Sequence, residues 1–124
     1  MRIFKTKWFA KWADKEGLND DSLLLAVQEM EQGLIDANLG SHVFKKRVGI
    51  AGRGKSGGVR TILAFKIKDR AFFMFGFAKN QQENISDREL QALKLLASQL
   101  LNYDHSALLK ALEAGELKEI NHGT

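Results

Sequence analysis

Two stretches near the N-terminus carry apolar residues at the three- and four-residue spacing of a helix. Residues 7–16 form the first, because Trp8 and Trp12 share a face and Gly17 is a residue type that ends helices. The second helix is predicted from about residue 21 to residue 33. Its expected buried stripe is Leu24, Val27, Met30 and Leu34. We expect both tryptophans to pack in the core.

A third helix is the most strongly patterned element of the chain. Ser86 and Glu89 have the S-x-x-E form of a capping box, and leucines recur behind it as far as Leu101. Asp104 is a capping residue for a further, shorter helix, which we expect over about residues 104–114. The last residues, ELKEINHGT, predict at most a short strand.

Alternating or continuous apolar residues predict four strands. Residues 2–5 and 43–48 alternate, and residues 59–67 are rich in β-branched and aromatic side chains. Residues 71–78 are almost continuously apolar, which is typical of a central strand covered on both faces. The short link between the last two strands predicts an antiparallel hairpin. We expect residues 35–41 to be a connection without regular structure.

These elements predict an α+β fold in which two N-terminal helices pack on a twisted, mainly antiparallel sheet, with C-terminal helices beside it. A chain of 124 residues has the length of a single domain. Its 44% hydrophobic and 27% charged residues are typical of a globular protein. No apolar run has the length of a membrane span, and lysines interrupt any signal-like segment, so we expect a cytoplasmic protein.

The amino-acid composition excludes several kinds of catalytic site. Cysteine is absent, which excludes disulfides and thiolate nucleophiles, and the three histidines are scattered without metal-ligand spacing. We therefore expect neither a metal nor a cofactor. The 19 lysines and arginines exceed the 15 acidic residues by a net charge of +4. This excess is modest, so the distribution of the cations is more informative than their number.

Residues 43–60 concentrate the positive charge and contain no carboxylate. In an extended strand, Lys45 and Arg47 stand on one face and Lys46 stands on the other. We expect a concave surface, free of acidic groups, that attracts the phosphates of a polyanion. The cations of the segment are Lys45, Lys46, Arg47, Arg53, Lys55 and Arg60.

The glycine-rich part of this segment, GIAGRGKSGG, matches the P-loop pattern G-x-x-x-x-G-K-[ST] literally from Gly49 to Ser56. A P-loop needs a helix directly after it, whereas Gly57 and Gly58 lead into a predicted strand. We therefore interpret residues 49–58 as a hairpin turn. Without a metal or a histidine, the cations can support RNA cleavage by the neighbouring 2′-OH, with a lysine favouring deprotonation and arginines stabilising the charge on phosphorus.

The order of elements and three motifs resemble the RelE/ParE superfamily of bacterial type II toxins, and look closest to its HigB-like branch. The resemblance covers about residues 2–101, and the helix over about residues 104–114 lies beyond it. It implies a RelE-like microbial RNase fold and a single toxin domain over residues 1–124. The motifs are Lys45-Lys46-Arg47-Val48, Gly54-Lys55-Ser56-Gly57-Gly58-Val59-Arg60 and Ala78-Lys79-Asn80-Gln81.

Carried over residue by residue, the resemblance implies catalytic roles for four cations. Lys45 and Arg47 match the strand pair implicated in nucleophile activation and phosphate contact. Arg60 matches the arginine that stabilises the transition state, and Lys79 matches the basic position after the last sheet strand. The residues expected to hold RNA or the ribosome are Lys46, Arg53, Lys55 and Asn80. For Lys46 an alternative stays open, in which its side chain only extends from the packed face of its strand.

The resemblance implies a ribosome-dependent mRNA endonuclease that inhibits translation and is neutralised by a cognate antitoxin. A helix-turn-helix DNA-binding protein is one candidate for that antitoxin. Two alternatives stay open: a ParE-like inhibitor of DNA gyrase, and an inactive module that binds RNA or the ribosome. Asn80 stands where RelE itself has a basic residue, and no aromatic residue lies near Ser86 in place of the RelE tyrosine; both departures favour the inactive module.

Overall fold

The computed structural model describes residues 1–50 and 54–121 of the chain, apart from the side chains of residues 54–57. Its centre is a six-stranded sheet with the strand order β2-β3-β4-β5-β1-β6. All neighbouring strands in it are antiparallel except β5 and β1, which run parallel. The strands are β1 (Arg2–Thr6), β2 (Ala37–Gly40), β3 (Val43–Ile50), β4 (Gly54–Lys66), β5 (Arg70–Ala78) and β6 (Leu117–Ile120).

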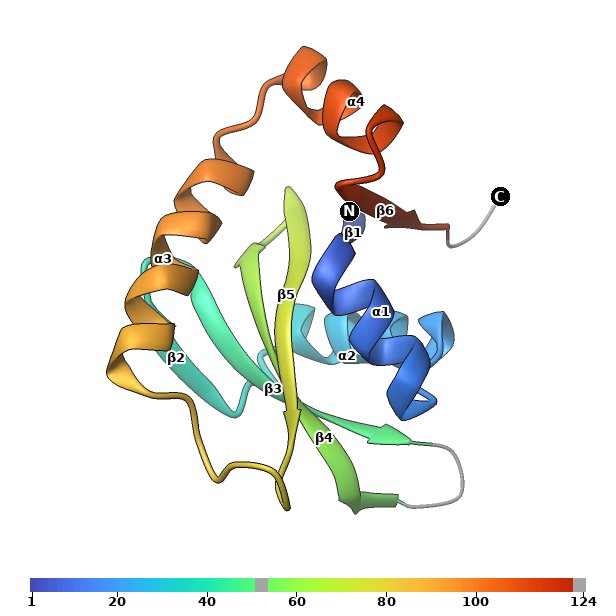
Figure 1. Ribbon diagram of the computed structural model, residues 1–124, viewed down its shortest axis with the longest axis vertical. Helices are drawn as coiled ribbons and strands as arrows, with labels where there is room; N and C mark the ends of the chain where they lie inside the picture. The colour runs from blue at the N-terminus through green and yellow to red at the C-terminus, as the bar shows by residue number, and fades with distance from the viewer. Residues whose placement is uncertain (51–53, 122–124) are drawn as a thin grey trace.

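Helices cover both faces of this sheet, which confirms the α+β class (Figure 1). The helices α1 (Lys7–Glu16) and α2 (Asp20–Glu31) lie on one face and α3 (Asp87–Leu101) lies on the other. The shorter helix α4 (His105–Glu113) leads from α3 back to β6, which pairs with β1 at the edge of the sheet. Each face has its own cluster of buried apolar side chains, so the sheet is the wall between two cores.

Local capping explains where the helices begin. Thr6 and Asp104 accept hydrogen bonds from the backbone N–H groups that open α1 and α4. Ser86 and Glu89 form the expected capping box at the start of α3. Asn19 caps α2 in the same way, so the four helices of the described residues all begin close to the positions that the sequence predicts.

The connection predicted over residues 35–41 is wrong, because it contains strand β2. The segment does alternate, since Ile35, Ala37 and Leu39 are apolar and Asp36 and Asn38 are polar, and its main chain pairs with β3 through an irregular register between Asn38 and Gly40. The prediction missed this alternation, which is typical of a half-buried strand, and the pairing with β3 fixes the position of the strand in the sheet. The C-terminal tail, expected to form a short strand or none, supplies β6.

The predicted apolar stripe of α2 is also wrong in part. Its buried residues are Leu23, Ala26, Val27 and Met30. Leu24 is only half-buried, and Leu34 is exposed because the helix ends at Glu31. In α1, Trp12 packs against the core cluster as expected, although it is only partly buried, whereas Trp8 keeps 49% of its surface exposed and does not belong to the core.

The hairpin turn is shorter than predicted over residues 49–58, since β3 continues to Ile50 and β4 begins at Gly54. Residues 51–53 of the turn lie outside the described residues. Gly58 allows the two strands to approach closely, because a Cβ atom there would lie 2.2 Å from the carbonyl oxygen of Val48.

Candidate functional site

The pairing of β3 with β4 brings three predicted catalytic cations together. The register places Arg47 directly opposite Arg60, and Lys45 lies two residues from Arg47 on the same face of β3. These three side chains line a hollow of about 290 Å³, which we call the basic hollow. The expected grouping of Lys45, Arg47 and Arg60 therefore exists in the structure.

The basic hollow is not free of carboxylates, which corrects an expectation from the sequence. Asp36, from the segment before β2, and Glu83, from the loop between β5 and α3, complete its lining. The carboxylate of Asp36 accepts a hydrogen bond from the backbone N–H of Arg47, and the N–H of Asp36 donates to the carbonyl of Lys45 over 3.3 Å. The segment with Asp36 is thus tied to the edge of β3 that carries the cations.

Arg60 carries the clearest unsatisfied group of the site. Its Nη1 atom is buried, and among the described residues it has no hydrogen-bond partner. A buried donor without a partner costs about 1–3 kcal/mol, and more when it belongs to a charged group. An anionic oxygen bound in the hollow would supply the missing acceptor.

The loop before α3 closes the hollow on its other side. Lys45 Nζ lies 3.5 Å from Asn84 Oδ1, the limit of a hydrogen bond. The loop is held by a hydrogen bond from Gln82 Nε2 to the carbonyl of Asn84, 2.9 Å long, and by the capping box that follows. The positions of Glu83 and Asn84 therefore depend on how α3 begins.

Lys46 lies on the opposite face of β3 and does not reach the basic hollow. It is 5% exposed, and its Nζ atom is 3.0 Å from Glu29 Oε1 and 2.9 Å from the carbonyl oxygen of Leu34. Side chains alternate along a strand, so the charge of Lys46 faces α2 instead. In this structure the ammonium group is occupied by protein contacts, which favours the alternative that Lys46 belongs to the packed face of the sheet, and its contact with RNA stays a prediction.

Lys79 and Asn80 are exposed in the turn after β5 and do not line the basic hollow. Arg53 and the side chain of Lys55 lie outside the described residues. The carboxylates Asp36 and Glu83 were not expected in the hollow because both lie outside residues 43–60. The segment beside β3 brings Asp36 to the cations, and the loop before α3 brings Glu83.

The part of the chain that the structure describes offers no cluster of three or more His, Cys, Asp or Glu residues suited to a metal ion. Among the same residues, no helix has the length and apolar character needed to cross a membrane.

The fold and the site define a small α+β protein with a cation-lined hollow at one end of an antiparallel hairpin. A family model described as "RelE toxin of RelE / RelB toxin-antitoxin system" matches residues 1–120. The chain therefore belongs to the RelE toxin family, and it is a toxin of a toxin–antitoxin system with a cognate antitoxin as partner. No curated protein matches the chain.

The matched range extends through β6, past residue 101, where the resemblance seen in the sequence ended. Helix α4 and strand β6 thus fall inside the family match. The assignment to the HigB-like branch stays a prediction.

Proposed function

We propose that this toxin is a ribosome-dependent endoribonuclease that cleaves mRNA in the cytoplasm and thereby inhibits translation. The observation that carries the proposal is the convergence of Lys45, Arg47 and Arg60 in one hollow, with a buried guanidinium donor of Arg60 that has no partner in the described chain. Such a donor set suits a phosphodiester whose charge increases during the reaction.

In the proposed reaction, the ribose 2′-oxygen attacks the adjacent phosphorus and the bond from phosphorus to the 5′-oxygen breaks. The products are a 2′,3′-cyclic phosphate and a 5′-hydroxyl. The charge of Lys45 stabilises the developing 2′-oxyanion, while Arg47 and Arg60 stabilise the extra charge on the phosphoryl oxygens. The 2′-OH proton passes to one of the carboxylates that line the hollow, Asp36 or Glu83.

Lys79 is proposed as the acid that protonates the leaving 5′-oxygen. Phe77 pairs with Arg60 across β4 and β5, and Lys79 follows Phe77 by two residues, in the turn after β5, so the two Cα atoms are at most about 7 Å apart. Lys79 is exposed and can turn toward a bound strand. Arg53, Lys55 and Asn80 remain proposed contacts to RNA or the ribosome.

The test is cleavage of a translated message by purified toxin on ribosomes, mapped by primer extension. We expect Arg60→Ala to lower the cleavage rate about 100-fold or more, since removing one such donor from an oxyanion site costs about 10²–10³ in rate. Arg60→Lys should recover only part of that rate, because a lysine cannot offer two parallel hydrogen bonds. Lys110→Ala, which removes an exposed lysine of α4, is the matched control and should cleave normally.

Growth arrest with intact mRNA would overturn the cleavage proposal and favour the gyrase inhibitor. Ribosome binding that spares both mRNA and growth would favour the inactive module. Retained antitoxin binding by Arg60→Ala establishes that the variant is folded.

A further inference from the structure

A polar pocket opens beside α3, where the turn between β2 and β3 meets the end of β4. It has a volume of about 460 Å³, within the range of ligand-binding pockets in proteins. Among the described residues no carboxylate lines it, and its lining includes two lysines. We call this site the polar pocket, and its donors include the side chains of Ser41, His42, Lys66, Lys94, Ser98 and Asn102.

The two lysines of the polar pocket have no partner in the described part of the chain. Neither Lys66 nor Lys94 forms a side-chain hydrogen bond or an ion pair there. Lys94 Nζ lies against the turn between β2 and β3, since a Cβ atom added to Gly40 would be 3.4 Å from it. Unpaired cations beside hydroxyl and amide groups favour a phosphate, whose oxygens accept hydrogen bonds from all of them.

The turn that carries Ser41 and His42 has an unusual backbone. Gly40 pairs with Val43, which leaves a two-residue loop between β2 and β3. The φ angles of Ser41 and His42 in this loop are 55° and 63°. Positive φ angles at both positions define a type I′ turn, for which Asn-Gly is the preferred pair. Strained non-glycine residues of this kind cluster at binding sites, and both side chains line the polar pocket.

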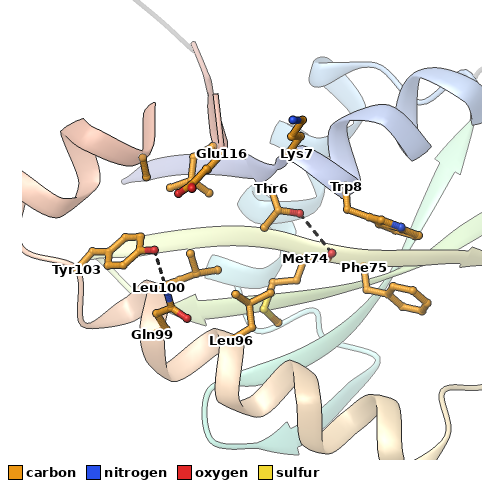
Figure 2. Close-up of a pocket in the computed structure, with 12 residues that line it drawn as sticks. Thr6, Lys7, Trp8, Met74, Phe75, Leu96, Gln99, Leu100, Tyr103 and Glu116 are labelled. Atoms are coloured by element: carbon orange, nitrogen blue, oxygen red, sulfur yellow. Dashed lines mark hydrogen bonds between the residues drawn. The ribbon is translucent and has the colours of Figure 1, made fainter. Parts of the chain in front are cut away.

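Helix α3 separates the polar pocket from an apolar groove, which lies beside β5 and the start of α1 (Figures 1 and 2). The apolar groove is lined mainly by aliphatic and aromatic side chains, among them Trp8, Phe75 and Leu96. No phenylalanine, tyrosine or tryptophan lines the polar pocket among the described residues. A nucleobase needs an aromatic face for stacking, so the polar pocket suits the phosphate and ribose of a nucleic acid instead of its bases.

The polar pocket and the basic hollow lie on the same face of the sheet. Val43 belongs to the core cluster that α3 covers, and Lys45, two residues further along β3, points to the same face. The Cα atoms of His42 and Lys45 are at most about 11 Å apart, because three residues separate them. A nucleic-acid strand that is bound in the basic hollow therefore has further phosphates close to the polar pocket.

We propose that the polar pocket binds the sugar–phosphate backbone of RNA at a phosphate other than the one that is cleaved. Lys66 and Lys94 neutralise this phosphate, while the Ser41 hydroxyl and the His42 ring donate hydrogen bonds to its oxygens. Contacts of this kind hold RNA without regard to its sequence. The inference rests on the proposed function, since it takes RNA as the ligand of the toxin.

The experiment measures the affinity of the full-length toxin for two probes, ribosomes without message and a short single-stranded RNA, at increasing salt. We expect the double variant Lys66→Gln/Lys94→Gln to weaken binding of at least one probe about 10-fold or more at low salt. The slope of log affinity against log salt should fall by about 0.7 for each lost phosphate contact. Lys11→Gln, an exposed position of α1 on the opposite face of the sheet, is the matched control and should bind normally.

His42→Gly separates binding from folding. Glycine adopts a positive φ without strain, so the midpoint of urea denaturation should rise. The affinity for RNA should nevertheless fall about 3-fold or more, because the ring that donates to the phosphate is lost. A purely structural role of the turn would not lower RNA affinity in a more stable variant.

Weaker binding of ribosomes alone would assign the phosphate to ribosomal RNA, and weaker binding of both probes would assign it to the message. Unchanged affinity of the double lysine variant and of His42→Gly for both probes would overturn the inference. Binding of inorganic phosphate that the double variant abolishes, with normal RNA affinity, would also overturn it and assign the polar pocket to a small anion.

A cleavage assay on ribosomes distinguishes this inference from the proposed function. The double lysine variant should need about 10-fold more ribosomes for half-maximal cleavage at an unchanged maximal rate. Arg60→Ala should instead lower the maximal rate. If the natural toxin leaves mRNA intact while the double variant still loses RNA affinity, only the cleavage proposal fails. If the natural toxin cleaves mRNA and the variants bind RNA normally, only the polar pocket loses its assigned role.

Discussion

The basic hollow and the apolar groove lie on the same face of the sheet but differ in how they are built. On β5, Phe77 pairs with Arg60 of the hollow, and Phe75, two residues earlier, lines the groove. The cations of the hollow come from two consecutive strands, β3 and β4. The groove joins the start of α1, β5, α3 and the segment around β6.

Each region also leaves a different kind of group without a favourable contact: a hydrogen-bond donor in the hollow and an apolar surface in the groove. The hollow gathers cations and leaves a buried donor of Arg60 unpaired among the described residues, whereas the groove exposes much of Trp8 to water. The first is relieved by an anion and the second by an apolar side chain. One sheet face thus offers two neighbouring surfaces of opposite chemistry, suited to different partners.

The largest expected effect is a loss of stability, and it tests whether Lys46 belongs to the contact with α2 or to the hollow. Lys46→Ala removes the ammonium group that faces Glu29, and we expect it to lower the free energy of unfolding by about 2–3 kcal/mol, less than for a fully buried pair because Glu29 is partly exposed. Lys46→Met keeps most of the side-chain volume and should cost clearly less. Urea denaturation measures both variants.

The same variants report on function. If Lys46 serves only the contact between β3 and α2, the folded fraction of Lys46→Met should cleave RNA at the normal rate. If Lys46→Met is stable but no longer cleaves RNA, Lys46 belongs to the RNA site. The assignment of Lys45 and Arg47 to the hollow and of Lys46 to the opposite face would then be wrong.

The sequence predicted the hollow far better than the groove, and the reason is physical. Lys45, Arg47 and Arg60 lie within one hairpin, where strand alternation decides which side chains share a face. The bulges of the sheet do not disturb this part of the register, so a local argument was sufficient. The β2 strand was missed although residues 35–39 alternate between apolar and polar side chains. The carboxylates of Asp36 and Glu83 reach the hollow only through the segment beside β3 and the loop before α3, and nothing in the basic hairpin itself predicts them.

Trp8 shows the same limit for the groove. Its spacing from Trp12 correctly predicted a shared helix, yet the two rings have different surroundings. Trp12 lies against Gly76 of β5, where a Cβ atom would come within 2.2 Å of the indole, and Trp8 reaches past the strand to Phe75 at the mouth of the groove. The packing of α1 on β5, and not helical periodicity, decides which tryptophan is exposed.

An intermediate effect is expected from the carboxylates, which decide whether the hollow performs chemistry or only binds phosphate. We expect Asp36→Asn to lower the cleavage rate about 10-fold, less than the usual contribution of a general base because Glu83 can share the role. The amide oxygen can still accept the hydrogen bond from the N–H of Arg47, so the fold should persist. Single-turnover cleavage on ribosomes measures the rate.

Glu83→Gln is the companion variant, and the double variant should lose more than either alone. Normal rates in the single and double variants would exclude both carboxylates as proton acceptors. A higher RNA affinity with a normal rate would show that they only oppose the cations.

The smallest effect concerns α3, which forms a wall of the groove and holds the loop that closes the hollow. The backbone N–H of Ser86 donates to the Glu89 carboxylate and holds the pKa of Glu89 below its ordinary value, against the opposing effect of partial burial. A carboxyl group whose pKa is lowered in the folded state stabilises the folded protein at pH values above the pKa of the unfolded chain, about 4.3. That contribution is lost as the pH falls through the folded pKa.

Glu89→Gln keeps an acceptor for Ser86 but removes the charge at the start of the helix. We therefore expect a loss of only about 0.3–0.5 kcal/mol at pH 7, since solvent screens this surface group. The difference from the natural chain should vanish near pH 3, as measured by urea denaturation at both pH values. Glu113→Gln, at the other end of a helix, is the control and should not destabilise the protein. If the difference instead persists at pH 3, the lost stability comes from the geometry of the cap, and the charge of Glu89 has no part in holding the wall that the hollow and the groove share.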